Sequence, residues 1–418
     1  MNQMTPNNIP QGYKATALGI IPQEWEVKKL GEVGKLLSGL TYTPSNIQSD
    51  GILVLRSSNI QNGVLAFDDN VYVNVSSYTP VKAGDILICV RNGSQNLIGK
   101  TALITQEAEG CAFGAFMAVF RSSISKYVFY LLGTELYRKY IFRNLGATIN
   151  SINGSDLKKF RFPFPPLAEQ RKIAEVLGVW DEAIEKQARL IEKLALRKRA
   201  LMQRLLSAKL RLPGFSEPWE KVKLGDICER VTRKNIEDNQ NVMTISAQRG
   251  FVAQTDFFNK SVASETLESY YLVFRDEFCY NKSYSNGYPM GAIKRLSEAE
   301  KAVVTSLYIC FNVKPGTDAN IDYLSYYFDN GGLNRGLTKI ANEGGRAHGL
   351  LNVTPKDFFG LSFEIPSLKE QTAIAEVLTA ADREIELAKE KLERLRRQKR
   401  GLMQQLLTGK KRVKYNKI

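Results

Sequence analysis

Two stretches of the chain carry the same spacing of apolar side chains. Between Glu169 and Leu206 apolar residues recur at alternating intervals of four and three, without a proline and with Gly178 as the single glycine. The same spacing returns between Ile374 and Leu406. A heptad pattern of this length is typical of helices that bury one stripe, or seam, against a partner helix. The predicted seam consists of Ile173, Leu177, Ile184, Ile191, Leu194, Leu201, Ile374, Leu378, Ile385, Leu392, Leu395 and Leu402.

The two stretches are copies of one sequence. Residues 165–209 and 366–410 align without a gap at an offset of 201, with 22 of 45 positions identical. A shorter match precedes each copy, because Trp25-Glu26 followed by Lys29-Leu30-Gly31 corresponds to Trp219-Glu220 followed by Lys223-Leu224-Gly225. An internal repeat determines architecture before any local assignment does. The chain is therefore predicted to be a tandem of two units, each a globular segment followed by a long helix.

Each helical seam needs a partner, and the other copy in the same chain is the natural one. The first helix leads into the second globular segment and the second helix follows it, so we expect antiparallel pairing with one globular domain at each end. Forty residues would form a rod of roughly 60 Å, which corresponds to about 17 base pairs of B-DNA. Both seams carry a lysine, Lys198 and Lys399. Such a lysine either fixes partner and register or extends to solvent near a frayed end.

The remaining segments show mixed patterns. Short strands are expected in residues 51–60, 70–75, 84–93 and 111–121 of the first segment, and in 242–250, 275–287 and 302–313 of the second. Residues 126–145 and 321–337 each resemble one helix with an aromatic face. The fold class is α/β, with two mixed α/β globular domains joined by a long antiparallel two-helix coiled coil. We place the boundaries at 1–21 (N-terminal tail), 22–164 (first globular domain), 165–211 (central helix), 212–365 (second globular domain) and 366–418 (C-terminal helix).

Composition narrows the class of protein. The chain has 44% apolar and 24% charged residues, which is ordinary for a globular protein. No apolar run approaches the ~18 residues of a membrane span, and no signal peptide is expected from the N-terminal sequence. The five scattered cysteines lack a CxxC pair, which favours a reducing compartment over a disulfide scaffold. A single histidine nearly excludes a histidine-based metal site.

Charge indicates a polyanionic partner. The formal net charge is +15, and the two helical segments contribute +5 (165–211) and +7 (366–418). The first globular segment has +4 and the second −2. A basic total favours nucleic acid as the partner, although solvated helix faces and cations near helix C-termini account for part of the excess.

Four loops combine glycine with side chains that can bind base edges or phosphates. They span residues 91–100, 143–154, 281–295 and 339–349. Arginine, asparagine and glutamine can form paired hydrogen bonds with guanine or adenine, while ordinary polar turns have a similar composition. The candidate DNA-binding residues are Arg91, Asn92, Gln95, Lys100, Arg143, Asn150, Asn153, Lys282, Tyr284, Asn286, Tyr288, Lys294, Arg295, Lys339 and Arg346.

No catalytic constellation is recognisable in the sequence. It contains no GxxxxGK[ST] phosphate loop, no glycine-rich turn with the spacing of a nucleotide or S-adenosylmethionine fold, and no Asn/Asp-Pro-Pro-aromatic tetrapeptide. The acidic residues form no convincing nuclease cluster. We therefore predict a recognition subunit without catalytic, cofactor-binding or metal-binding residues of its own.

The quoted motifs resemble the DNA-specificity subunits of type I restriction-modification enzymes. The similarity lies in PPLAEQRKIAEVL (165–177) and IPSLKEQTAIAEVL (365–378), which look like the starts of that family's two conserved helical regions. GYKATALGIIPQEWEVKKLGEV (12–33) and LPGFSEPWEKVKLGDI (212–227) look like the starts of its two target-recognition domains. The departures are small: Ser367 stands where the first copy has Pro166, and the C-terminal tail is basic.

The resemblance implies a non-catalytic, cytoplasmic prokaryotic protein. Each recognition domain would bind one half of a bipartite, asymmetric DNA sequence, and the helices would set the gap between the halves. Two modification subunits would dock on the helical regions and methylate one adenine in each half, and restriction subunits would join them for cleavage. S-adenosylmethionine, ATP and Mg²⁺ are expected on these partners and not on this chain.

The resemblance also suggests a docking surface at the start of each long helix. Its candidates are Glu169, Gln170, Glu370 and Gln371, although an acidic first turn is also favoured by the helix dipole alone. A specificity subunit of a related system that cuts beside its site is a close variant of this interpretation, and two alternatives to the whole interpretation remain. One is a stand-alone architectural or regulatory DNA-binding protein, which would not co-purify with methyltransferase chains. The other is a cryptic methyltransferase or nuclease, which would bind S-adenosylmethionine by itself.

Overall fold

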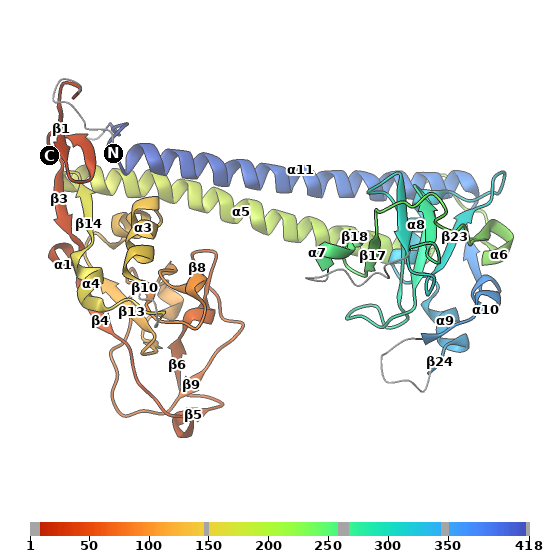
Figure 1. Cartoon of the computed structure of the whole chain (residues 1–418), viewed down its shortest axis with the longest axis horizontal. Coiled ribbons are helices and arrows are strands. Elements are labelled where there is room, and N and C mark those ends of the chain that lie inside the picture. Colours follow the sequence, from red (N-terminus) through yellow and green to blue (C-terminus); the bar gives the residue numbers. More distant parts are fainter. Residues whose placement is uncertain (1–8, 146–149, 258–266, 344–350, 415–418) are drawn as a thin grey trace. The chain divides into compact units, whose positions relative to one another are not determined.

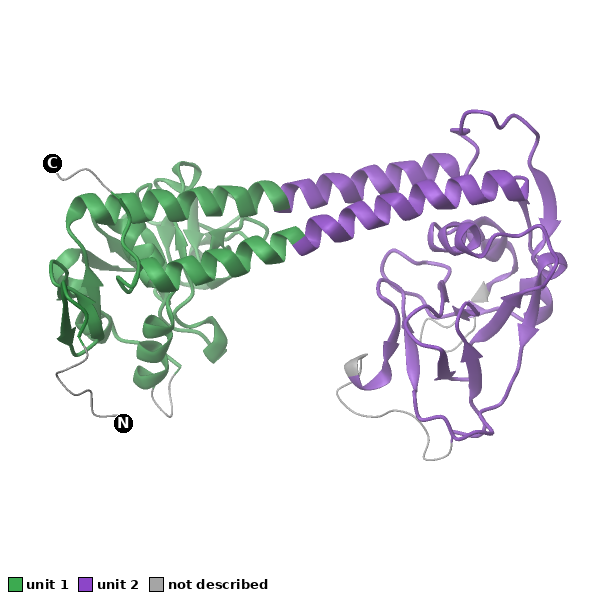
Figure 2. Ribbon diagram, turned by 90° about the horizontal axis from the view of Figure 1, so that it is seen from above, with its two compact units in different colours: residues 1–187, 391–418 green, residues 188–390 purple. Residues whose placement is uncertain are grey.

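The chain forms two compact units, which a computed structural model describes for residues 9–145, 150–257, 267–343 and 351–414. Unit 1 comprises residues 1–187 and 391–418, and unit 2 comprises residues 188–390 (Figure 2). Each unit therefore contains one globular domain together with part of both long helices. Within the described ranges, no helix is both long and apolar enough to span a lipid bilayer.

The two long helices are α5 (Leu167–Leu205) and α11 (Leu368–Leu406), each of 39 residues. They pair antiparallel within each unit (Figure 1). In unit 2, Leu194 packs against Ile385 and Ala388, with Ile191 beside them. All twelve predicted seam side chains are buried or half-buried. Those near the helix ends also pack into the domains, so that Ile173 and Leu177 join the core of unit 1.

The seam lysine of unit 1 is bound from two directions. Lys399 of α11 forms an ion pair with Asp181 of α5, and its side chain is 17% exposed. The Tyr130 hydroxyl of the globular domain donates to the other oxygen of Asp181 (2.7 Å). The Lys399 ammonium also lies 5.1 Å from the centroid of the Tyr130 ring. This triad links both helices to the globular domain of unit 1.

The seam lysine of unit 2 repeats this arrangement. Lys198 Nζ donates to Asp382 Oδ1 (2.6 Å), and the Tyr326 hydroxyl donates to Asp382 Oδ2 (2.8 Å). Burial, together with the neighbouring carboxylate, raises the pKa of Tyr326 to about 12, so its hydroxyl stays protonated and able to donate. Of the two interpretations of the seam lysines, the structure favours the one in which they fix partner and register.

Reversing one charge of this pair will destabilise the helix pair of unit 2. Asp382→Lys places two ammonium groups together, at an expected cost of about 1 kcal/mol because the site is partly solvated. The reciprocal exchange Lys198→Asp with Asp382→Lys should recover most of the loss, as a double-mutant cycle in urea unfolding would show. The control is Glu386→Lys, which reverses the acidic member of the exposed Glu386–Lys389 pair of α11. Equal losses at the two pairs would contradict a register role.

Unit 1 is built on a four-stranded antiparallel sheet. Its order is β11-β10-β13-β4, formed by Thr101–Leu103, Ile86–Cys89, Met117–Arg121 and Lys35–Ser38. A second sheet of short strands has the order β12-β6-β9-β5, formed by Ala112–Phe113, Ile52–Leu55, Tyr72–Val73 and Ile47–Gln48. The pairs β1–β2 (Tyr13–Thr16, Gly19–Pro22), β3–β14 (Glu26–Lys29, Arg161–Phe164) and β7–β8 (Ile60–Gln61, Val64–Leu65) complete its strands.

The helices of unit 1 depart from the prediction at one place. Residues 126–145 form two helices, α2 (Ser125–Leu131) and α3 (Glu135–Asn144), where we expected one. The break follows from Gly133 and from Thr134, whose hydroxyl accepts the Tyr137 N–H and caps α3. The short helices α1 (Leu30–Val33) and α4 (Gly154–Lys159) pack against each other beside the β3–β14 pair.

Unit 2 repeats this topology with a different sequence. Its main antiparallel sheet has the order β21-β20-β23-β16, formed by Ala292–Arg295, Phe278–Asn281, Ile309–Val313 and Cys228–Val231. When the four strands of each main sheet are ranked by their position in the sequence, the two sheets have the same order of ranks from edge to edge. The other strand pairs are β15–β26 (Glu220–Lys223, Ser362–Ile365), β17–β18 (Met243–Ser246, Gly250–Ala253), β19–β22 (Tyr271–Phe274, Lys301–Val304) and β24–β25 (Asn342–Glu343, Leu351–Asn352).

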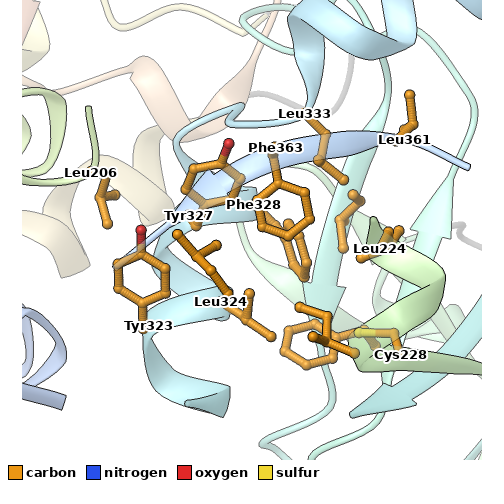
Figure 3. Close-up of a cluster of buried hydrophobic side chains, with 14 of the residues drawn as sticks. Leu206, Leu224, Cys228, Tyr323, Leu324, Tyr327, Phe328, Leu333, Leu361 and Phe363 are labelled. Atoms are coloured by element: carbon orange, nitrogen blue, oxygen red, sulfur yellow. The ribbon is translucent and has the colours of Figure 1, made fainter. Parts of the chain in front are cut away.

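Unit 2 has five short helices within its described residues, and all but the second correspond in order to the four of unit 1. The five are α6 (Leu224–Ile227), α7 (Gln254–Phe257), α8 (Ile321–Asp329), α9 (Asn334–Ile340) and α10 (Pro355–Phe359). The single helix predicted over 321–337 is interrupted, because Gly331 has a φ of +75° and ends α8. Aromatic side chains of α8 fill the core together with Leu206, which directly follows α5, and Phe363 of β26 (Figure 3).

The C-terminal ends of the two long helices use one closing motif. In α5, the Leu210 N–H donates back to Arg204 across Ala208, whose φ is +56°. In α11, the Lys411 N–H donates back to Gln405 across Gly409, whose φ is +73°. A Cβ at Gly409 would overlap the ring of Pro22 in β2. Packing therefore requires glycine here, whereas Ala208 adopts the same left-handed conformation at the end of α5. The N-terminal hairpin and the end of α11 are therefore in close contact in unit 1.

Candidate nucleic-acid interface

Two loops of unit 1 that we selected separately are hydrogen-bonded to each other. One follows β10 and the other follows α3. The Ile152 N–H donates to the carbonyl of Val90 (2.8 Å), and the Asn92 N–H donates to the carbonyl of Asn150 (3.2 Å). The Asn150 side chain donates in turn to the carbonyl of Gly93 (3.0 Å). These bonds bring residues 90–100 and 150–153 together into one surface.

The candidate side chains of this surface divide into two groups. Asn92 donates to the Ser57 hydroxyl (2.9 Å) and accepts the Ser94 N–H, so it shapes the loop, as Asn150 does. Arg91, Gln95 and Lys100 are exposed and available to a ligand. Charged and amide side chains of this kind can bind phosphates and base edges.

An exposed aromatic ring adjoins the surface of unit 1. The Arg91 guanidinium lies 5.7 Å from the ring centroid of Phe116, which is 55% exposed. The carbonyl of Phe116 accepts the N–H groups of Val90 and Arg91, which fixes the ring beside the first loop. Sequence reasoning did not select Phe116, although it follows the short strand that precedes β13. The two remaining candidates, Arg143 in the last turn of α3 and Asn153 before α4, are both exposed.

In unit 2 the loop after β20 is bonded to β25 at the equivalent place, whereas most of the predicted loop 339–349 lies outside the described residues. Val90 directly follows β10, and Lys282 directly follows β20. The carbonyl of Lys282 accepts the Leu351 N–H (3.0 Å), as that of Val90 accepts the Ile152 N–H in unit 1. In both units, therefore, the residue after the second strand of the main sheet accepts a hydrogen bond from the segment that directly precedes the last short helix, α4 or α10.

Positive charge gathers near the loop that follows β20 in unit 2. Lys282 is half-buried, and burial together with the charge of Arg230 lowers its pKa. Two cations that repel each other in a partly desolvated place favour an anionic ligand. Tyr284 (63% exposed) and Asn286 lie in the same loop, and the Asn286 carbonyl accepts a hydrogen bond from Gln248 (3.1 Å).

Three candidates of unit 2 are engaged inside the domain, which speaks against a role in DNA contact. Lys294 forms an ion pair with Asp329 of α8 and is only 12% exposed, and the Tyr288 hydroxyl donates to the same carboxylate (3.2 Å). Arg295 donates to Asp322 (2.6 Å). The physical reason is that β21 packs against α8, whose carboxylates neutralise these side chains. Lys339 is exposed at the end of α9, whereas Arg346 lies outside the described residues.

Sequence reasoning missed two exposed cations beside these loops. Arg230 in β16 and Arg249 after β17 are both exposed, and Arg249 is adjacent to the Gln248 that binds the Asn286 loop. The basic run from Arg230 to Lys234 was the available signal for the first. No comparable signal marked Arg249, because its position next to the loop depends on tertiary packing.

The family model described as the type I restriction modification DNA specificity domain matches residues 22–195 and 216–397. The chain belongs to this specificity family. Its two matches correspond to the two copies of the repeat.

Relatives of the specificity family match along nearly the whole chain. The type I restriction enzyme MjaX specificity subunit of Methanocaldococcus jannaschii is 27% identical, with 97% of each chain covered. The StySPI specificity subunit of Salmonella potsdam is 27% identical over 85% of this chain and 81% of its own. The EcoKI specificity subunit of Escherichia coli K12 is 33% identical over a shorter part, 38% of this chain and 36% of its own.

Solved structures share the fold. The S subunit of a type I restriction-modification system from M. genitalium superposes with a TM-score of 0.53 at 18% identity, covering 97% of this chain and 98% of that chain. A chain from a structure of type I system assembly and conformational transition gives a TM-score of 0.54 at 17% identity, covering 93% and 99%.

The predicted docking surface of this specificity-family chain is wrong in one respect, because its side chains are not exposed. Glu169, Gln170, Glu370 and Gln371 are between 0% and 8% exposed. Gln170 and Gln371 donate to the carbonyls of Pro165 (2.7 Å) and Pro366 (2.8 Å). Gln371 also accepts the backbone N–H of Asn320 (2.8 Å). These side chains therefore attach each helix to its own domain.

The two glutamates form buried ion pairs that the repeat duplicates. In unit 1 Arg412 donates to both oxygens of Glu169 (2.6 and 2.7 Å), and the Trp25 indole N–H adds a third bond (3.1 Å). In unit 2 Arg211 donates to both oxygens of Glu370 (2.6 and 2.8 Å). A carboxylate buried at a helix start needs such a cation. Arg211 and Arg412 share the offset of 201, which is the signal that would have revealed the pairs.

Proposed function

We propose that this chain is the DNA-recognition subunit of a type I restriction-modification complex and that each domain recognises one half of a bipartite, asymmetric sequence. In this proposal the paired helices set the gap between the halves. Modification subunits bind the chain for adenine methylation, and restriction subunits join for cleavage. The alternative of a stand-alone DNA-binding regulator has no observation in its favour beyond the basic charge.

One observation supports the proposal more than any other. In both units the loop after the second strand of the main sheet is bonded to the segment before the last short helix, yet the side chains of this loop differ. Unit 1 presents Arg91, Gln95 and Lys100, whereas unit 2 presents Lys282, Tyr284 and Asn286. A common scaffold with different exposed side chains is what two recognisers of different sequences require.

The chemistry of methylation would be supplied by the partners. S-adenosylmethionine on the modification subunits would donate the methyl group, and ATP and Mg²⁺ would serve the restriction subunits, with none of these held by this chain. The target adenine must leave the duplex to be methylated, so this chain would hold the flanking phosphates while the base rotates out. We also propose a cytoplasmic location, where the chromosome is accessible.

Mapping methylated adenines tests this function. The chain would be expressed with its modification subunits in a host that lacks other adenine methyltransferases, and modified positions would be located across the genome. The expected result is one bipartite motif with two different halves and a fixed gap. Methylation with a single continuous motif, or a chain that never co-purifies with modification subunits, would contradict the proposal.

Removing one basic side chain from the loop surface of each unit should weaken DNA binding. Arg91→Ala and Lys282→Ala are each expected to reduce affinity for the mapped sequence by about tenfold or more, since a good base or phosphate contact contributes ~1–3 kcal/mol. Fluorescence anisotropy with a labelled duplex measures the effect on the assembled complex. Lys126→Ala, which removes an exposed lysine of α2 outside these loops, is the matched control. Equal losses in the control and the loop variants would remove the two loops from the interface.

A further inference from the structure

Unit 1 contains a cavity that the proposed DNA interface does not use. Its volume is about 960 Å³, and its walls come from the β1–β2 hairpin, the segment from α2 into α3, and the last turns of α11. We call it the hairpin groove. A space of this size lies in the range of sites that enclose a ligand or a peptide segment.

The hairpin groove has an apolar wall and a basic rim. Apolar side chains are supplied by Leu18 of the hairpin, Leu136 of α3 and Met403 of α11. Four cations line it as well: Arg138, Lys139, Arg400 and Lys410. Arg138 pairs with Glu135 on its own helix (2.6 Å). Within the described part of the chain, the other three have no carboxylate partner, and all three are exposed. The groove therefore combines apolar surface with unneutralised positive charge.

The hairpin wall is held firmly in place. The Tyr13 hydroxyl donates to the carbonyl of Gly409 (3.0 Å), and the ring of Pro22 packs against the same glycine. The Gln23 N–H closes the base of the hairpin on the carbonyl of Gly12 (2.8 Å). Since the hairpin is anchored to the end of α11, the groove is a formed feature of unit 1.

Unit 2 lacks the element that makes this wall. The corresponding segment, residues 207–219 between α5 and β15, is fully described and contains no strand. This segment contains Arg211, which binds the buried Glu370 as Arg412 binds Glu169 in unit 1. It contains no counterpart of the β1–β2 hairpin. The pseudo-two-fold repeat is therefore broken at this place, and a partner that uses the hairpin groove binds one copy per chain.

We propose that the hairpin groove is the docking site of one acidic, amphipathic segment of a modification subunit. This inference rests on the proposed function. Apolar side chains of the segment contact Leu18, Leu136 and Met403, while its carboxylates pair with Lys139, Arg400 and Lys410. DNA phosphates would match the cations but not the apolar wall. The walls come from both the recognition domain and α11, so the bound segment holds a methylating subunit against the domain whose half-site it modifies.

The first test is a charge reversal with a matched control. The variant Lys139→Glu, Arg400→Glu, Lys410→Glu would be titrated with the purified modification subunit of the same system, and complexes would be counted by native mass spectrometry. The control variant Lys35→Glu, Lys126→Glu, Arg161→Glu makes the same change in net charge at exposed positions of unit 1 outside the groove.

The groove variant is expected to affect the binding of only one of the two modification subunits. The wild-type and control chains should bind two, and the groove variant should bind one normally and the other about tenfold more weakly. Equal binding of two subunits by both variants would overturn the docking proposal and leave the proposed function intact. A wild-type chain that binds no modification subunit would instead refute the proposed function. A groove variant that loses DNA binding without modification subunits would assign the groove to DNA and also overturn the docking proposal.

A second test does not depend on the stability of a triple variant. A photo-crosslinking amino acid at Leu18, which is half-buried in the hairpin, would be activated in the assembled complex. The expected product is a crosslink to a segment of the modification subunit rich in aspartate or glutamate. A crosslink only to this chain, to a second copy of it, or to DNA would contradict the proposal.

Discussion

Replacing residues 30–160 by residues 224–361 should convert the recognised sequence into an interrupted palindrome. Both segments begin and end at the same contact, because the Leu30 N–H donates to the carbonyl of Phe160 (2.8 Å) and the Leu224 N–H donates to that of Leu361 (2.8 Å). The replacement leaves the β3–β14 pair, Trp25 and Glu169 in place. A chain with two copies of one recognition domain on an antiparallel helix pair should recognise the same half-site twice, in inverted orientation.

The expected effect is large because DNA-binding proteins commonly bind their specific sequence a thousandfold or more tighter than other DNA, a difference of about 4 kcal/mol. Mapping methylated adenines in a host that carries the replaced chain would measure it. The introduced Tyr326 is expected to donate to Asp181 as Tyr130 does, since it makes this bond with Asp382 in its own unit. The converse replacement, residues 224–361 by 30–160, is the matched control and should duplicate the other half-site. Retention of the original asymmetric motif by a folded, methylating complex would refute recognition by separate domains.

Arg412→Met should destabilise the start of α5 by about 3 kcal/mol. The Glu169 carboxylate is fully buried, and Arg412 supplies two of the three hydrogen bonds that its oxygens receive. Removing the cation leaves an uncompensated buried charge. Hydrogen exchange measured by mass spectrometry for residues 167–177 would report the loss as faster opening of this helix start, while unit 2 should be unchanged.

Two further variants separate charge burial from lost packing. Arg412→Met combined with Glu169→Gln should recover most of the stability, since a glutamine oxygen can still accept the Trp25 indole N–H and no charge stays buried. Arg396→Met removes a cation that is 45% exposed and paired along its own helix, so its effect should stay below about 0.5 kcal/mol. If Arg412→Met behaves like Arg396→Met, the buried pair is not what anchors the helix.

The candidate site illustrates how far composition alone can go. The loops rich in glycine, asparagine and basic residues were identified from the sequence, and the structure bonds the two loops of unit 1 to each other. In unit 2 most of the second loop lies outside the described residues. Composition could not separate Arg91, which is exposed, from Lys294, which is neutralised by Asp329 on another element. That distinction depends on which helix covers which strand. Phe116 and Arg249 were missed for the same reason, because neither belongs to a distinctive local pattern.

The sequence by itself determined the repeat, the two long helices, their seams and the family, since heptad spacing and gapless identity are properties of residues close together in the chain. Only the tertiary structure decided the partners of the charged residues in the repeat. Glu169 and Arg412 are separated by 243 positions, and Lys198 and Asp382 by 184. Periodicity states which side of a helix is buried, but not which distant group neutralises a buried charge, because that choice is made by the packing of the whole unit.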